Sequence, residues 1–172
     1  MELRMVTSES KELDTVIKLY KESFPPIEHR DIKSAFFDKT GIVSVFAFYE
    51  TDSFCGFACT LQHLDICYIL YLATVPSLRG KGIGSKILAQ LHSHYLQKII
   101  VLDIEEEDSK SENNNERIRR KRFYLRNGYQ ETHIINEWRG ISFEVLSINE
   151  IISKKKYDDF WLYIEKNTCG LM

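Results

Sequence analysis

The chain has 172 residues, which is long enough for one domain with a sizeable core, and it carries a formal net charge of −2 with a pI near 6.2. This near balance of charge gives no reason to expect a nucleic-acid or membrane partner, and neither a signal-peptide core nor an apolar run of membrane-spanning length is present. The cysteines follow no metal-binding or Cys-x-x-Cys spacing, so we expect no metal and a cytoplasmic protein; they are Cys55, Cys59, Cys67 and Cys169.

The N-terminal part predicts a short strand, two helices and a strand hairpin. These elements are expected at Leu3–Val6, Leu13–Phe24, Ile32–Phe36, Ile42–Tyr49 and Phe54–Leu61. Ser10 is the expected cap of the first helix, and Pro25-Pro26 its stop. The hairpin is expected to turn across Glu50–Ser53.

The middle of the chain predicts a strand, a glycine-rich loop, a helix and another strand. The apolar run Tyr68–Val75 ends at Pro76 and reads as a strand. Helical spacing begins at Ile83, and we expect a helix over Ser85–Gln97 followed by a buried strand at Ile99–Ile104.

The C-terminal part begins with a polar segment, Glu105–Asn115, which predicts a loop. A helix over Glu116–Arg126 then ends at a glycine cap, Asn127-Gly128. A hairpin over residues 131–147 is expected to turn at Arg139-Gly140, and a closing helix or tail carries several aromatic residues. No repeat or long linker interrupts this order, so we expect a mixed α/β fold in a single domain, residues 1–172.

A strand that runs into a glycine loop and then into a helix start is suited to hold phosphate. Glycines let the backbone approach an anion, and the helix N-terminus adds partial positive charge, to which Arg79 and Lys81 add full charges. A Walker loop is excluded because Lys81 lies between the glycines. A dinucleotide fingerprint starts at Gly80 and Gly82 but has Ser85 at its third position. A loop that only turns a corner is the remaining alternative.

Two motifs resemble those of GNAT-type N-acetyltransferases. Arg79, Gly82 and Gly84 are similar to the Arg/Gln-x-x-Gly-x-Gly/Ala loop that grips the pyrophosphate of acyl-CoA in that family. Residues Arg122–Tyr129 resemble the family's Phe-Tyr-x-x-x-Gly-Phe/Tyr signature, and the order of elements is similar along nearly the whole chain. The resemblance implies a central, mostly antiparallel sheet, splayed at the fourth strand and flanked by helices.

The resemblance also implies acetyl-CoA as the co-substrate. The residues that it assigns to the coenzyme are Leu72, Ala73, Thr74, Arg79, Gly80, Lys81, Gly82, Ile83, Gly84, Ser85 and Tyr124. The resemblance implies that Tyr124 lies beside the coenzyme sulfur. A phenol is protonated at pH 7, so Tyr124 can act there as general acid toward a leaving thiolate.

The general base is open. Many members of the family have a glutamate where this chain has Tyr71. Glu105, at the end of the strand after the coenzyme helix, is our first choice for the catalytic base, and His63 and a water-relayed path are alternatives.

Acceptor binding is expected from the segment between the first two helices. Phe24–Arg30 is similar in part to a Phe-Pro-x-x-Glu-x-Arg segment of some bacterial members. Glu28 can pair with a cationic amine and Arg30 with a carboxylate, while Tyr71 faces the same region; an ordinary charged turn is the alternative. The basic run Arg117–Arg122 is expected to form a solvated helix face, with one of its arginines near the coenzyme phosphate or the acidic loop.

These observations predict an N-acetyltransferase that moves an acetyl group from acetyl-CoA to a primary amine of a small molecule or peptide. Direct attack in a ternary complex is expected, since no cysteine falls in a site motif. The alternative is a non-catalytic sensor or interaction module that binds acyl-CoA. Whether two copies form a homodimer stays open.

Overall fold

A computed structural model describes residues 1–168 of the chain. Its elements, in order, are β1 (Glu2–Met5), α1 (Leu13–Ser23), η1 (Pro26–Glu28), α2 (Ile32–Ala35), β2 (Val43–Glu50), β3 (Ser53–His63), β4 (Ile66–Thr74), η2 (Pro76–Leu78), α3 (Ile83–His94), β5 (Ile99–Glu105), α4 (Asn114–Arg126), β6 (Gln130–Trp138), β7 (Ile141–Ile148) and α5 (Lys154–Asn167). The predicted order of strands and helices is confirmed.

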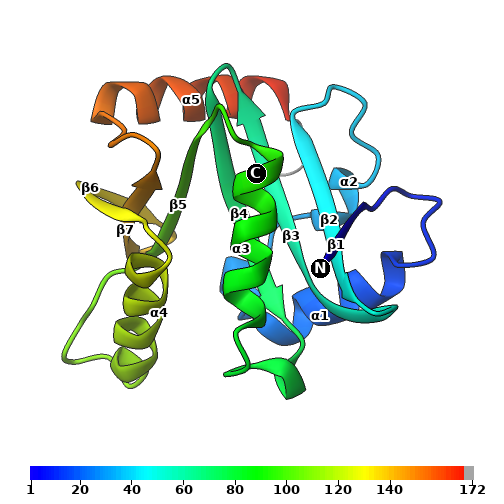
Figure 1. The fold of residues 1–172 in the computed structure, drawn as a ribbon. Helices are drawn as coiled ribbons and strands as arrows, with labels where there is room; N and C mark the ends of the chain where they lie inside the picture. Colours follow the sequence, from blue (N-terminus) through cyan, green and yellow to red (C-terminus); the bar gives the residue numbers. More distant parts are fainter. Residues whose placement is uncertain (169–172) are drawn as a thin grey trace.

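The strands form one seven-stranded sheet in the order β1-β2-β3-β4-β5-β7-β6. Every neighbouring pair is antiparallel except β4 and β5, which pair in parallel only at Ile66–Tyr68 with Ile99–Val101. Beyond that short contact the two strands diverge and split the sheet into two arms (Figure 1). The prediction of a mostly antiparallel sheet splayed at its fourth strand is therefore confirmed.

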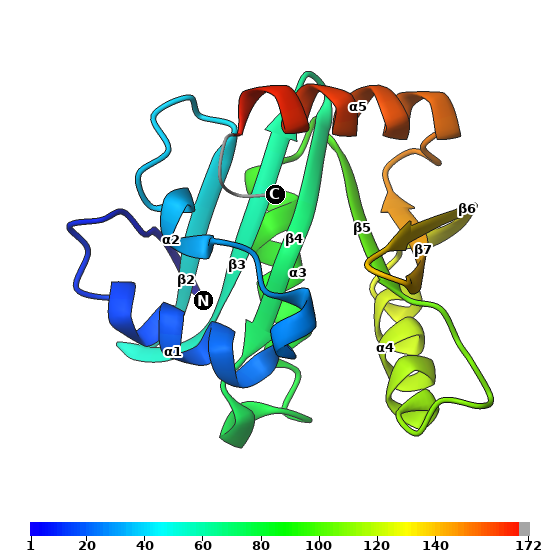
Figure 2. The ribbon, with the colours of Figure 1, turned by 180° about the vertical axis from the view of Figure 1, so that it is seen from behind.

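Helices cover both faces of the sheet. α1 and α2 pack on one face, and α3 and α4 on the other, as the two opposite views show (Figures 1 and 2). α5 lies across the end of the sheet where β4 and β5 converge, and its buried Phe160 and Ile164 join the α1 side of the core. Because α5 covers the closed end of the splay, the cleft opens at the opposite end.

A bulge in β4 sets which residues face the cleft. Thr60 of β3 pairs with Ile69 and Cys59 pairs with Tyr71, so Leu70 is the extra residue of the bulge. A bulge interrupts the strict alternation of side chains along a strand. Tyr68 and Tyr71, three positions apart, consequently lie on the same face, in the core cluster shared with α1 and α5.

Both predicted hairpin turns are confirmed. Thr51 and Asp52 have φ values of +45° and +64°, and Arg139 and Gly140 have values of +51° and +76°. Positive φ at both central residues is typical of the two-residue turn that suits the twist of antiparallel strands. The second turn places Arg139 beside the segment between α1 and α2.

Two local predictions are wrong. Ser10 does not cap α1, because the helix begins only at Leu13 and the Ser10 hydroxyl oxygen accepts a hydrogen bond from the Thr7 N–H at 2.9 Å. The first strand ends at Met5 instead of Val6.

Cys55, Cys59 and Cys67 are buried free thiols, and Cys169 lies outside the described residues. Within residues 1–168, no helix has the length and apolar character that crossing a membrane requires.

Candidate active site

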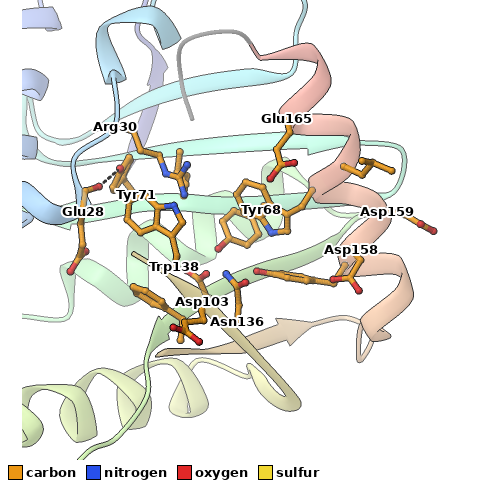
Figure 3. A pocket seen from close by; sticks show the side chains of 16 residues that line it. Glu28, Arg30, Tyr68, Tyr71, Asp103, Asn136, Trp138, Asp158, Asp159 and Glu165 are labelled. Carbon is orange, nitrogen blue, oxygen red and sulfur yellow. Dashed lines mark hydrogen bonds between the residues drawn. The ribbon is translucent and has the colours of Figure 1, made fainter. Parts of the chain in front are cut away.

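Two cavities open at the splay of the sheet. The first, which we call the groove, has a volume of about 680 Å³ and runs from the glycine loop along β4 to β5 and α4. The second, which we call the chamber, has a volume of about 620 Å³ and lies between the α1–α2 segment, β6 and α5 (Figure 3). Each has the size of an ordinary small-molecule site.

The groove and the chamber meet. They share five lining residues, which we call the junction: Glu28, Leu70, Tyr71, Asp103 and Phe143. The junction lies where β4 and β5 have already separated, so the strand backbones there are not paired with each other. A molecule in the groove and a molecule in the chamber can therefore touch.

The glycine loop leaves room for an anion beside backbone donors. Gly80 and Gly82 have φ values of +74° and +78°, a left-handed conformation that favours glycine, and a Cβ at either position would meet nothing within 4 Å. No side chain caps the N-terminus of α3, which begins at Ile83. The first N–H groups of the helix are thus left to a ligand, and their partial positive charge favours a phosphate.

Gly84 has a packing role. A Cβ on Gly84 would lie 3.0 Å from the Cζ atom of Phe123. Contact this short would require the Phe123 ring to shift, so Gly84 allows α3 to approach α4 closely. This approach places the next residue of α4, Tyr124, on the wall of the groove.

Tyr124 presents a protonated hydroxyl to the groove. Its ring is 9% exposed and contacts the rings of Phe123 and Tyr129 edge-on. Burial raises the pKa of Tyr124 to about 12. Because no described residue forms a hydrogen bond with this hydroxyl, its proton is available to a bound molecule.

Glu105 lines the groove, and its carboxylate is paired with two arginines. Its two oxygens form ion pairs with Arg117 at 3.0 Å and with Arg120 at 2.8 Å. The side chain of Arg117 is only 14% exposed and lies against the acidic segment, as expected for one arginine of this basic run. The predicted role of Glu105 as base is not tested by these contacts, but two guanidinium groups already occupy its oxygens.

Glu28 lies at the junction with its carboxylate unpaired. Within residues 1–168 its side chain makes no ion pair or hydrogen bond. Burial is the main cause that raises the pKa of Glu28, and the nearby charge of Glu105 adds to it. The Tyr71 hydroxyl donates a hydrogen bond of 2.8 Å to the Glu28 carbonyl, so strand β4 holds the backbone of this residue.

The chamber is aromatic and acidic. The Arg30 guanidinium lies 4.2 Å from the centroid of the Trp138 ring and 5.9 Å from that of Trp161. Asp103 faces the same space, and burial raises its pKa, although Tyr68 and Arg30 favour its ionised form. These side chains converge from both arms of the sheet (Figure 3).

A sequence model of the acetyltransferase (GNAT) domain matches residues 42–131, which contain the glycine loop and Tyr124. This chain belongs to the GNAT acetyltransferase family. The prediction of a GNAT acetyltransferase is thereby confirmed. No curated protein matches the sequence.

Solved structures of other GNAT proteins have the same fold. A GNAT-family protein from Bacteroides thetaiotaomicron is 23% identical over 100% of both chains, with a TM-score of 0.79. The ribosomal-protein-S18-alanine N-acetyltransferase of Escherichia coli is 13% identical over 90% of this chain and 97% of its own, with a TM-score of 0.63. An aminoglycoside 6′-N-acetyltransferase complexed with coenzyme A is 14% identical over 90% of this chain and 99% of its own, with a TM-score of 0.65.

The structure of this GNAT brings most of the predicted site residues together. Ten of the predicted coenzyme residues line the groove: Leu72, Ala73, Thr74, Arg79, Gly80, Gly82, Ile83, Gly84, Ser85 and Tyr124. Lys81 is exposed and does not line it. His63 stacks on Tyr163 with ring centroids 3.5 Å apart and lines neither cavity, which leaves it remote from the junction.

Several residues of the GNAT site carried no signal in the sequence. Asp103 sits in an apolar strand, and Trp138 and Trp161 come from a hairpin end and from the closing helix. Arg139 donates hydrogen bonds to the carbonyls of Ile27 at 2.8 Å and His29 at 3.3 Å, which ties the second hairpin to the α1–α2 segment. Only the fold places these segments at one cavity. Among residues 1–168, no group of three or more histidine, cysteine or acidic side chains is arranged to hold a metal.

Proposed function

We propose that this GNAT protein, with residues 1–172 acting as one domain, transfers an acetyl group from acetyl-CoA to a primary amine. The observation that carries the proposal is the meeting of two cavities at the splay, one built around an anion-binding loop and the other lined by carboxylates. Acyl transfer needs two substrates in contact, and the junction is the point where they meet.

The groove is the proposed donor site. Its glycine loop and the α3 N-terminus suit a pyrophosphate, with Arg79 beside them. The unpaired edge of β4 from Leu72 to Thr74 offers backbone groups to an extended pantetheine arm. In support, an aminoglycoside 6′-N-acetyltransferase of the same fold was solved with coenzyme A, and a GNAT acetyltransferase from Elizabethkingia anophelis with acetyl-CoA.

The chamber is the proposed acceptor site. Its acidic lining consists of Glu28, Asp103, Glu137, Asp158, Asp159 and Glu165, and the lining cation among residues 1–168 is Arg30. Asp158 and Asp159 pair with Lys154 and Lys155, which leaves four acidic side chains of this lining without a lysine partner among the described residues. A free primary amine has a pKa near that of lysine, ~10, so it arrives as an ammonium ion and is attracted to this lining. The carboxylates therefore favour an amine acceptor.

The chemistry proposed for the junction is direct attack. The ammonium ion gives one proton to a base, and the freed nitrogen lone pair forms a bond to the thioester carbonyl carbon. As the C–S bond breaks, Tyr124 gives its proton to the sulfur and recovers one from the new amide nitrogen. The products are an acetamide, a thiol and one released proton, so atoms and charge balance.

Thiol release from acetyl-CoA tests the proposal. The purified protein is incubated with acetyl-CoA and, separately, 1,4-diaminobutane, spermidine, 2-phenylethylamine, kanamycin and a peptide with a free N-terminus. We expect amine-dependent thiol release with at least one of them. Saturable acetyl-CoA binding without thiol release across the panel would instead support a non-catalytic acyl-CoA-binding module, and no binding of any CoA would refute both.

A further inference from the structure

We infer that Glu28 is the catalytic base of this reaction and that Tyr71 is the residue that positions it. The inference rests on the proposed function, since it names the group that takes the proton from the acceptor amine. Three carboxylates lie near the junction, and the contacts of each decide between them: Glu28, Asp103 and Glu105.

A base needs an oxygen lone pair open to the incoming ammonium ion. Glu105 has both oxygens in ion pairs with Arg117 and Arg120. Asp103 makes no ion pair with a described residue, but the Tyr68 and Asn136 side chains hydrogen-bond to it and the charge of Arg30 also favours its ionised form. The carboxylate of Glu28 accepts no hydrogen bond in the described part of the chain, and Arg120 and Arg117 act on it only through their charge, so it is the open one.

The backbone around Glu28 forms hydrogen bonds with three side chains, those of Tyr71, Tyr20 and Arg139. Tyr71 donates a hydrogen bond to the Glu28 carbonyl at 2.8 Å, and the Tyr20 hydroxyl accepts one from the Arg30 N–H at 2.8 Å. The two tyrosine hydroxyls are 3.3 Å apart, with Tyr20 donating to Tyr71. Arg139 binds the Ile27 carbonyl from the other arm of the sheet. These bonds fix the backbone from which the Glu28 side chain reaches the junction.

Tyr71 itself is unsuited to take the proton. Burial is the main reason that the pKa of Tyr71 lies far above its usual value, and Tyr20 raises this pKa further. The Tyr71 hydroxyl therefore stays protonated. Its proton is already directed to the Glu28 carbonyl. The Tyr71 hydroxyl thus holds the backbone carbonyl of Glu28, on the segment before α2 (Figure 3).

The charges that face Glu28 come from two elements. Glu105 and Asp103 on β5 raise its pKa, as burial does, whereas Arg120 and Arg117 on α4 lower it. The net direction is upward. A carboxylate with a raised pKa is a better proton acceptor near neutral pH than an ordinary one.

The test compares Glu28→Gln with Asp103→Asn and Glu105→Gln, with the most active amine of the panel as acceptor. We expect Glu28→Gln to lower kcat by ~10²-fold or more and to remove the acidic limb of the pH profile, with acetyl-CoA affinity unchanged. Glu28→Asp should restore part of the activity and the limb. The assignment would be overturned if Glu28→Gln kept both the kcat and the acidic limb of the wild type. It would also be overturned if Asp103→Asn or Glu105→Gln, instead of Glu28→Gln, lost them.

Tyr71→Phe tests the positioning role. This variant keeps the ring but loses the hydrogen bond to Glu28, so we expect kcat to fall ~10-fold and the acidic limb to shift, with an unchanged dissociation constant for acetyl-CoA. Tyr163→Phe, far from the junction, is the control. An unshifted limb in Tyr71→Phe would reject a positioning role.

A readout without acceptor separates this inference from the proposed function. In carbon-detected NMR of the coenzyme A complex, the Glu28 carboxyl signal, assigned by its loss in Glu28→Gln, should titrate above the usual midpoint of a glutamate, ~4.3. Titration at or below that midpoint would reject Glu28 as the base, whereas absence of thiol release together with the raised Glu28 midpoint would refute only the proposed activity.

Discussion

The groove and the chamber differ in which parts of the chain line them. The glycine-loop part of the groove is built from one continuous segment, β4 to α3, which presents backbone groups and glycines. The chamber is built from side chains of the α1–α2 segment, β4, β5, β6, β7 and α5, which are far apart in the sequence. The difference teaches that a cavity lined by backbone leaves a local sequence pattern, and a cavity lined by side chains of separate segments does not.

The largest expected effect comes from a substitution that blocks the groove and leaves the chamber intact. Gly82→Val places a β-branched side chain at a φ of +78° in the anion-binding loop. We expect acetyl-CoA binding, measured by calorimetry, to weaken roughly 100-fold or more, which corresponds to about 3 kcal/mol. Gly41→Val is the matched control, since Gly41 also has a φ of +76° but lies outside both cavities. Equal loss of binding in both variants would show a folding effect.

Removing the Tyr124 hydroxyl separates chemistry from binding. Because burial raises the pKa of Tyr124 to about 12, the hydroxyl stays protonated throughout the neutral range. Tyr124→Phe should lower kcat ~10²-fold and leave the affinity for acetyl-CoA within about twofold of the wild type. Tyr129→Phe, whose ring packs against Tyr124, is the control. Full activity in Tyr124→Phe would remove this residue from the mechanism.

The ion pairs of Glu105 sharpen the difference between a structural and a catalytic carboxylate. Glu105→Gln leaves Arg117 without its buried counter-charge, and we expect it to lower the free energy of unfolding by about 2 kcal/mol. Glu131→Gln, which affects the more exposed pair with Lys121, should cost under about 0.5 kcal/mol. Urea denaturation measures both. Unchanged stability in Glu105→Gln would mean that the ion pairs contribute little.

The smallest expected effect is at the contact between the two arms. Arg139→Ala removes the hydrogen bonds to the Ile27 and His29 carbonyls, which hold the acceptor segment. We expect KM for the amine to rise about fivefold, equivalent to roughly 1 kcal/mol, with KM for acetyl-CoA unchanged. Arg119→Ala, on an exposed part of α4, is the control. A rise in KM for acetyl-CoA instead would place Arg139 on the donor side.

The sequence predicted the groove well because its signals are local. Glycine is required where φ is positive, so Gly80 and Gly82 mark the loop directly, and hydrophobic periodicity marks β4 and α3. The Ser10 cap was wrong, since short polar side chains choose among several nearby backbone partners. The first strand was displaced by one residue.

The sequence indicated three residues that line the chamber, Glu28, Arg30 and Tyr71, but neither the rest of its lining nor the pairing of the carboxylates near the junction. Asp103 and Trp138 reach one cavity only because β5 and β7 pair and carry β6 alongside. Glu105 and Glu28 look alike as residues, but Arg117 and Arg120 pair with the first and nothing in residues 1–168 pairs with the second. Such pairing depends on distances between elements, which spacing along the chain does not contain.

Initial-rate kinetics with both substrates varied test the central claim most directly. If the groove and the chamber hold acetyl-CoA and the amine at the same time, reciprocal plots of thiol release at several fixed amine concentrations must intersect. The account predicts such intersecting lines, as direct attack across the junction requires. Parallel lines would show that the acetyl group first moves to the protein and would contradict the account.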